Sequence, residues 1–225
     1  MGLKIMIQAI IFDCDGVLVD SEFLLIDLEI KMLKEIGLNY DFEQFRNRFL
    51  GVTDSTFKER LNEDYNALYQ KPLPDGFFSH LETHLINELK QNLCPVLGIS
   101  DFISSLSLPK AVASNSGYTW LLEKLHLTNL HGHFNPHIYA GEMVQRGKPA
   151  PDLFLMVADK LGVSPENCLV IEDSANGVKG AKAAGMKTVG FLGGRHCNDN
   201  HGLLLTKAGA DTLCTSADEL AQHLI

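Results

Sequence analysis

A short apolar run near the N-terminus, followed at once by two carboxylates, constrains the fold of this chain most. Residues 5–12 are apolar except for Gln8, and Asp13, Asp15 and Gly16 follow within four positions. A near-continuous apolar run is typical of a parallel strand that is buried on both faces, and ligand sites lie just past the carboxyl ends of such strands. We therefore expect an α/β protein with Asp13 and Asp15 at the open edge of its sheet.

The two carboxylates stand two residues apart, so their side chains are expected on the same side of the chain. Carboxylates held that close repel each other unless a cation or a shared proton intervenes. A divalent metal with oxygen ligands, Mg²⁺, is the simplest account. Two other readings compete with it. One is a surface turn, and the other is a calcium loop, which Gly16 and Glu22 fit but which lacks an acid at its first position, Ile11, and a preceding helix.

Residues 21–90 show helical periodicity and no convincing strand. Ser21 is the predicted N-cap of the first helix. Further helices are expected at 41–50, from 54 to about 61, over 62–69, and from about 77 to 90. Phe42, Phe45 and Phe49 recur at helical spacing, which is more typical of core packing than of a ligand-binding surface.

From about residue 95 the pattern alternates between strands and helices. The strands are expected at 110–114, 137–140, 168–172, 187–191 and 211–214, and the helices at 99–106, 117–126, 151–162, 175–184 and 217–224. Such alternation implies right-handed βαβ units and a parallel sheet. The N-terminal strand belongs with this sheet, because alone it could bury nothing. We predict a core domain of residues 1–20 and 91–225, with an all-helical domain, residues 21–90, inserted after the first strand.

Charge and cysteine usage narrow the class of protein. The chain has 225 residues, a formal charge of −9 and no cluster of lysine and arginine, which argues against nucleic acid or a membrane surface as the main partner. The five dispersed cysteines predict reduced thiols rather than a disulfide framework or a zinc site. We read Cys14 as a packed thiol, although a nucleophilic role is conceivable.

We see no signal peptide and no membrane span, and expect a cytoplasmic protein.

Three later strand ends carry polar residues. Ser114 and Asn115 follow an apolar strand, where a hydroxyl and backbone N–H groups can bind phosphate, although from this stretch alone a plain helix cap is the better reading. Lys148 is followed by Pro149 and Pro151 just before a helix, and it is either a phosphate-neutralising lysine or a solvated loop lysine. Glu172 and Asp173 end the strand at 168–172, and two adjacent acids there favour metal binding.

Taken together and in this order, these residues resemble the four motifs of the haloacid dehalogenase-like (HAD) phosphatases. The resemblance covers nearly the whole chain, including an α-helical cap after the first motif. It implies a Rossmann-like parallel core with an inserted cap. The chain is most similar to the sugar-phosphate phosphatases and the β-phosphoglucomutase-like members, through the stretches DGVLVDSE, FLGV, GKPAPD and IEDS.

The resemblance also implies a mechanism. Asp13 would be the nucleophile that forms an aspartyl-phosphate, and Asp15 would be the acid and base that serves the leaving alcohol and the attacking water. Ser114, the Asn115 amide and Lys148 would bind the phosphoryl oxygens.

The implied metal is Mg²⁺. It would be held by the Asp13 side chain, the Asp15 backbone carbonyl and Asp173, with Glu172 coordinating directly or through water. The substrate would be a small phosphorylated metabolite, a sugar phosphate or sugar-acid phosphate. Cap contacts are expected from Arg48 and from the turn that contains Gly51, and we expect a monomer.

The main alternative is a β-phosphoglucomutase-like phosphosugar mutase. In that family a basic residue precedes the cap glycine and an arginine follows it, whereas here Leu50 precedes Gly51 and Asp54 follows. A histidine expected early in the first cap helix is replaced by residues of the stretch 23–25. These departures favour hydrolysis over isomerisation.

Two further readings fit less well. A dehalogenase needs no metal and lacks the second acid of the first motif, so Asp15 and the pair Glu172 and Asp173 oppose it. A catalytically idle, metal-binding interaction domain would not need the complete acid set.

Overall fold

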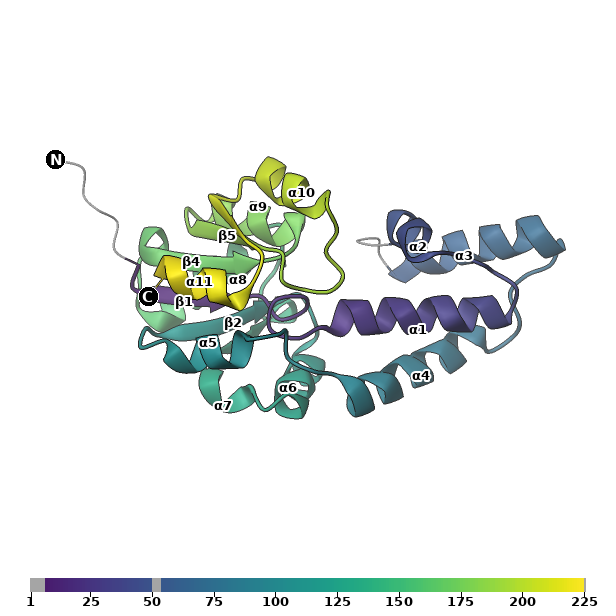
Figure 1. Ribbon diagram of the computed structural model, residues 1–225, viewed down its shortest axis with the longest axis horizontal. Helices are drawn as coiled ribbons and strands as arrows, with labels where there is room; N and C mark the ends of the chain where they lie inside the picture. Colours follow the sequence, from purple (N-terminus) through teal and green to yellow (C-terminus); the bar gives the residue numbers. More distant parts are fainter. Residues whose placement is uncertain (1–6, 50–53, 225) are drawn as a thin grey trace. The chain divides into compact units, whose positions relative to one another are not determined.

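The computed structural model describes residues 7–49 and 54–224 of the chain (Figure 1). These residues form two compact units. The first combines Met1–Ser21 with Leu93–Ile225, and the second is Glu22–Asn92. The turn with Gly51 lies outside the described residues. Within the described ranges, no helix has both the length and the apolar character needed to cross a bilayer.

The first unit is built on a six-stranded parallel sheet with strand order β3-β2-β1-β4-β5-β6. Its strands are β1 (Ala9–Phe12), β2 (Lys110–Ser114), β3 (Ile138–Ala140), β4 (Cys168–Glu172), β5 (Lys187–Phe191) and β6 (Thr212–Cys214). This is the order of a Rossmann-like sheet, whose direction of winding reverses beside β1, and ligands bind outside the strand ends at such a point. The predicted fold class is confirmed.

Helices cover both faces of the sheet (Figure 1). Ile10 and Phe12 of β1 pack on one face with α5 (Ile99–Ser105), α6 (Tyr118–Leu127), α7 (His131–Phe134) and α11 (Ala217–Leu224). Ala9 and Ile11 pack on the other face with α8 (Asp152–Leu161) and α9 (Ala175–Ala183). All four β1 side chains are fully buried, so a strand with apolar residues on both faces is required here.

Two helices of this unit were not expected from the sequence. They are α7 and α10 (His201–Ala208), and the latter leads into β6. Neither has a side-chain hydrogen bond at its N-cap, and α10 carries Gly202 in its first turn, so the usual start signals are missing. Short 3₁₀ turns at Gly141–Met143 and Pro165–Asn167 complete the unit.

The second unit contains the helices α1 (Ser21–Glu35), α2 (Phe42–Phe49), α3 (Asp54–Tyr69) and α4 (Phe77–Asn92). Phe45 and Phe49 are buried in its core with Leu61, Tyr65 and Leu81, as the aromatic stripe predicts. One expectation is wrong: the two helices predicted for residues 54–69 form the single helix α3. The core explains this, because Leu61 and Tyr65, four residues apart on one face, hold the two halves in register.

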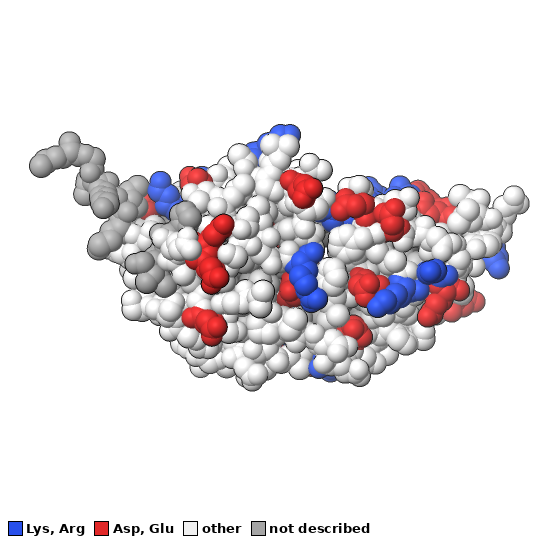
Figure 2. Space-filling view, viewed as in Figure 1, with Lys and Arg blue, Asp and Glu red and all other residues white. Residues whose placement is uncertain are grey.

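Basic and acidic side chains are interspersed on the face shown in Figure 2. Among the described residues of that face no continuous basic surface appears.

Glu29 of α1 should make the stability of the protein fall with rising pH. Burial raises the pKa of its carboxyl from 4.5 to about 7. A raised folded-state pKa means that its stabilising contribution is complete below pH 4.5, is lost as the pH rises toward 7, and stays lost above that. We expect Glu29→Gln to melt like wild type at pH 4 and to be more stable at pH 8, on the order of 2 kcal/mol. Thermal unfolding at both pH values is the measurement.

The matched control is Glu35→Gln, on the exposed surface of the same helix. It should leave the pH dependence unchanged. Equal effects of the two substitutions at pH 8 would contradict the role of burial.

Candidate active site

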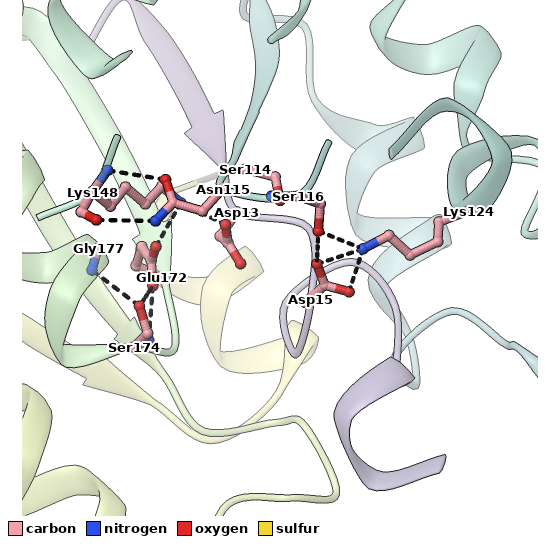
Figure 3. A network of polar contacts seen from close by, with 10 residues as sticks. All are labelled: Asp13, Asp15, Ser114, Asn115, Ser116, Lys124, Lys148, Glu172, Ser174 and Gly177. Atoms are coloured by element: carbon pink, nitrogen blue, oxygen red, sulfur yellow. Dashed lines mark hydrogen bonds and ion pairs between the residues drawn. The ribbon is translucent and has the colours of Figure 1, made fainter. Parts of the chain in front are cut away.

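Three neighbouring strands bring polar side chains to one edge of the sheet. Asp13 directly follows β1, while Ser114 and Glu172 are the last residues of β2 and β4, the two strands that flank β1. The Asp13 N–H donates to the carbonyl of Ile171 at 3.0 Å, which extends the ladder by one residue and fixes where the Asp13 side chain leaves the sheet. The three side chains therefore meet at the winding reversal of the sheet (Figure 3).

Lys148 bridges two of the acids. Its ammonium nitrogen lies 2.5 Å from Asp13 Oδ1 and 2.7 Å from Glu172 Oε1, and the side chain is buried. Burial alone would lower the pKa of Lys148, but the two carboxylates outweigh it and raise the pKa above its ordinary value. Lys148 is therefore a permanent buried cation beside Asp13, and the reading as a solvated loop lysine is wrong.

Asn115 holds the backbone on which Lys148 stands. Its Oδ1 accepts from the Lys148 N–H at 2.9 Å, and its Nδ2 donates to the Lys148 carbonyl at 3.0 Å. Both polar atoms of the Asn115 side chain are therefore used to position Lys148. The backbone N–H of Asn115 is the group that could bind an oxygen of a phosphate ligand. Ser114 lies beside it, and its Oγ accepts from the Ser116 N–H at 3.1 Å.

Glu172 is held at both carboxylate oxygens. Oε1 accepts from Lys148, while Oε2 accepts from the Ser174 N–H at 2.7 Å and from the Ser174 hydroxyl at 2.9 Å. Ser174 also caps α9 by accepting from the Gly177 N–H at 3.0 Å. A Cβ on Gly177 would lie 1.6 Å from Glu172 Oε1, so only glycine lets the helix approach this carboxylate.

Asp13, Glu172 and Asp173 form a buried carboxylate cluster. One oxygen from each lies within 4.8 Å of the others. Burial, together with the neighbouring acids, raises the pKa of Asp13 to about 7 and that of Asp173 well above its ordinary value. When all three are ionised, Lys148 balances only one of the charges, so the cluster has an excess of two negative charges.

This cluster fits Mg²⁺. Hard divalent cations prefer carboxylate and carbonyl oxygens, and the excess charge equals that of the ion. Gly16 supports the fit: its φ is +79°, and a Cβ there would lie 1.9 Å from Asp173 Oδ2, so the chain after Asp15 can pass close to this acid only with glycine.

Asp15 has a different environment from Asp13. Its carboxylate accepts from Lys124 Nζ at 2.5 Å and from the Ser116 hydroxyl at 2.9 Å (Figure 3). It also accepts from the Ser21 hydroxyl at 2.5 Å. Burial would raise the pKa of Asp15, but the Lys124 ammonium and these hydrogen bonds lower it below its ordinary value. Lys124 thus relieves the charge of the Asp15 side chain, and the metal contact expected of Asp15 is that of its backbone carbonyl.

Lys124 and Ser116 were not foreseen as site residues. Lys124 lies on α6 between Leu121 and Leu125 and is buried with them. A lysine on the apolar face of an amphipathic helix must have an anionic partner, and that pattern is visible in the sequence. The sequence pattern does not show that the partner is Asp15, 109 residues away.

Arg48, the expected cap contact, is paired within the second unit. Its guanidinium donates to Asp64 through Nε at 2.9 Å and Nη2 at 2.7 Å, and Tyr40 donates to the same carboxylate at 2.6 Å. The three residues line a cavity of about 730 Å³. A substrate anion that binds Arg48 would have to share it with Asp64.

Residues 7–185 match the family model of the haloacid dehalogenase-like hydrolases. A phosphorylated carbohydrates phosphatase of Thermotoga maritima is 32% identical over 92% of this chain and 93% of its own. A 6-phosphogluconate phosphatase of Escherichia coli is 28% identical over 87% of this chain and 85% of its own. A HAD family hydrolase of Deinococcus radiodurans, solved with bound phosphate and sodium, is 31% identical with a TM-score of 0.85 over 98% and 96% of the chains. The chain belongs to the haloacid dehalogenase-like hydrolase family.

Proposed function

We propose that the protein is a Mg²⁺-dependent phosphatase that hydrolyses a small phosphorylated metabolite, a sugar phosphate or sugar-acid phosphate, through an aspartyl-phosphate on Asp13. One observation carries the proposal. Asp13 lies at the winding reversal of the sheet with a buried lysine 2.5 Å away and two further buried acids beside it. The names of the relatives from Thermotoga maritima and Escherichia coli support the class of substrate.

The reaction has two steps. A carboxylate oxygen of Asp13 attacks phosphorus, the bond to the alcohol oxygen breaks, and Asp15 gives that oxygen a proton. Asp15 then takes a proton from water, the water oxygen attacks phosphorus, and the bond to Asp13 breaks to release phosphate. Lys148, Ser114 and the Asn115 backbone N–H would bind the equatorial oxygens, where charge develops.

The metal would be held by the side chains of Asp13 and Asp173 and by the backbone carbonyl of Asp15, with Glu172 coordinating directly or through water. When bound, Mg²⁺ supplies positive charge that lets an anionic nucleophile approach an anionic phosphate.

The ion pair with Lys124 affects the two proton transfers that Asp15 would perform. Lys124 favours the ionised carboxylate, which suits the second step, in which Asp15 accepts a proton from water. The first step needs a proton on Asp15, which the ion pair opposes. We therefore infer that the Lys124 contact loosens when a substrate binds.

Substrate selection would involve the second unit. Arg48 and Gly51 stay our proposed contacts there, and Tyr40 and Asp64 set the orientation of the Arg48 guanidinium. We also propose that the protein acts as a monomer.

The proposal is tested by phosphate release from an aryl phosphate and from a panel of phosphorylated sugars and sugar acids. We expect turnover with Mg²⁺, a loss of at least about 100-fold in excess chelator, and recovery when Mg²⁺ is restored. Full turnover in the chelator would refute the metal requirement. Conversion of a sugar phosphate to its isomer with little free phosphate would make the mutase the better answer.

A further inference from the structure

A second cluster of metal-binding side chains lies in the segment between β5 and the start of α10. His196, Cys197 and His201 each offer one donor atom, and these atoms lie within 4.8 Å of one another. Both histidines are buried and Cys197 is half-buried, so the cluster borders solvent at the thiol. None of the three has a role in the reaction proposed above.

The separation of two donor atoms matches tetrahedral zinc. His196 Nε2 and Cys197 Sγ lie 3.5 Å apart. With Zn–N of about 2.0–2.1 Å, Zn–S of about 2.3 Å and a tetrahedral angle, two such ligands are separated by about 3.5 Å. Nitrogen and thiolate ligands select zinc-like ions, whereas the neighbouring carboxylate cluster selects hard ions such as Mg²⁺.

His201 makes a ring hydrogen bond of the kind that metal-ligating histidines commonly make. Its Nε2 donates to the backbone carbonyl of Asp173 at 2.5 Å. Metal-ligating histidines commonly donate their other ring N–H to a carbonyl, which fixes the tautomer and directs Nδ1 to the metal. The His201 ring stands at 87° to the His196 ring, with centroids 5.3 Å apart.

Asp173 connects this cluster to the active site. Its Oδ2 lies 2.9 Å from His196 Nε2, so the carboxylate that would hold Mg²⁺ also borders the second cluster. A metal on His196 Nε2 would remove that hydrogen bond and attract the Asp173 carboxylate as a fourth ligand.

We propose that His196, Cys197 and His201 bind a zinc-like transition metal at a site distinct from the Mg²⁺ site, and that occupancy of this site inhibits the enzyme by drawing Asp173 away. The claim that a metal binds here is argued from the geometry of the donor atoms. The claim that the bound metal inhibits the enzyme also rests on the proposed phosphatase function.

Binding is tested with Co²⁺, a spectroscopic substitute for Zn²⁺, titrated into the metal-free full chain in excess Mg²⁺. We expect one equivalent to give tetrahedral d–d bands together with a thiolate-to-metal charge-transfer band. Cys197→Ser should lose the charge-transfer band, and His201→Gln should weaken Co²⁺ binding at least about 10-fold.

The matched control is Cys94→Ser, which removes the exposed thiol and should keep the wild-type spectrum. Absence of the charge-transfer band in wild type, or its persistence in Cys197→Ser, would overturn the site. Binding at surface histidines alone gives no such band, because it involves no thiolate.

Inhibition is tested by phosphate release in excess Mg²⁺ with increasing Zn²⁺, each variant being compared with its own zinc-free rate. We expect wild type and Cys94→Ser to lose activity in parallel, and Cys197→Ser to need at least about 10-fold more Zn²⁺. Equal sensitivity of all three would refute the coupling through Asp173. If no phosphorylated compound is turned over at all, the proposed function fails, while the cobalt spectrum still decides the metal site.

Discussion

Replacing Asp13 with asparagine should lower kcat by at least about 10³-fold, because an amide is a poor nucleophile and cannot form the phosphoenzyme. The substitution keeps the size of the side chain. Lys148 retains Glu172 as a partner at 2.7 Å, so the lysine is not left buried without a carboxylate. The measurement is phosphate release at saturating substrate and Mg²⁺.

Two controls isolate the nucleophile. Asp211→Asn removes an acid that pairs with Lys182 at 2.8 Å outside the cluster, and it should keep wild-type turnover. Asp13→Ala should be as inactive as Asp13→Asn, and it cannot regain a carboxylate by hydrolysis of the amide. A kcat near the wild-type value in folded Asp13→Ala would refute the role of Asp13.

Replacing Asp15 with asparagine should trap the phosphoenzyme. Water then has no base to take its proton, so release of phosphate from Asp13 should slow by about 10²- to 10⁴-fold. An aryl phosphate is the right substrate, because its leaving group needs no protonation and the first step can still proceed. Rapid acid quench should show a burst close to one equivalent of the aryl alcohol per enzyme, followed by slow turnover.

The stability of this variant needs its own control. Asparagine leaves the Lys124 ammonium, which is 2% exposed, without its carboxylate, and breaking a buried pair in this way costs about 3–5 kcal/mol. The double variant Asp15→Asn with Lys124→Met removes both charges and should recover much of the thermal stability but not the slow second step. Release of phosphate at the wild-type rate by either variant would show that Asp15 is not the base.

The parallel sheet and the meeting of its strand ends were predictable from the sequence. Buried parallel strands need apolar residues on both faces, so β1, β2 and β4 can be recognised in the sequence as apolar runs. Because the strands are parallel, their carboxyl ends lie at one edge of the sheet. That is why Asp13, Ser114 and Glu172 could be placed together from the order of motifs alone. Helices were harder to predict where local signals are weak: α10 lacks a capping side chain, and α3 depends on its core contacts.

The partners of each side chain were decided only by the tertiary structure. Position in the chain suggested that Asp13 and Asp15 share one environment, yet Asp13 faces Lys148 while Asp15 faces Lys124, each more than 100 residues away. Asn115 is likewise committed to the Lys148 backbone.

The sequence by itself thus determined the Rossmann-like fold, the edge at which the site lies and the residue types gathered there, because strand periodicity and strand direction are local properties that the chain carries in its order of residues. The tertiary structure alone decided which carboxylate meets which lysine, and that His196, Cys197 and His201 come together beside Asp173. Such pairings depend on how separate helices and loops pack over the sheet, and on the direction of each side chain once it is packed, which residue spacing does not specify.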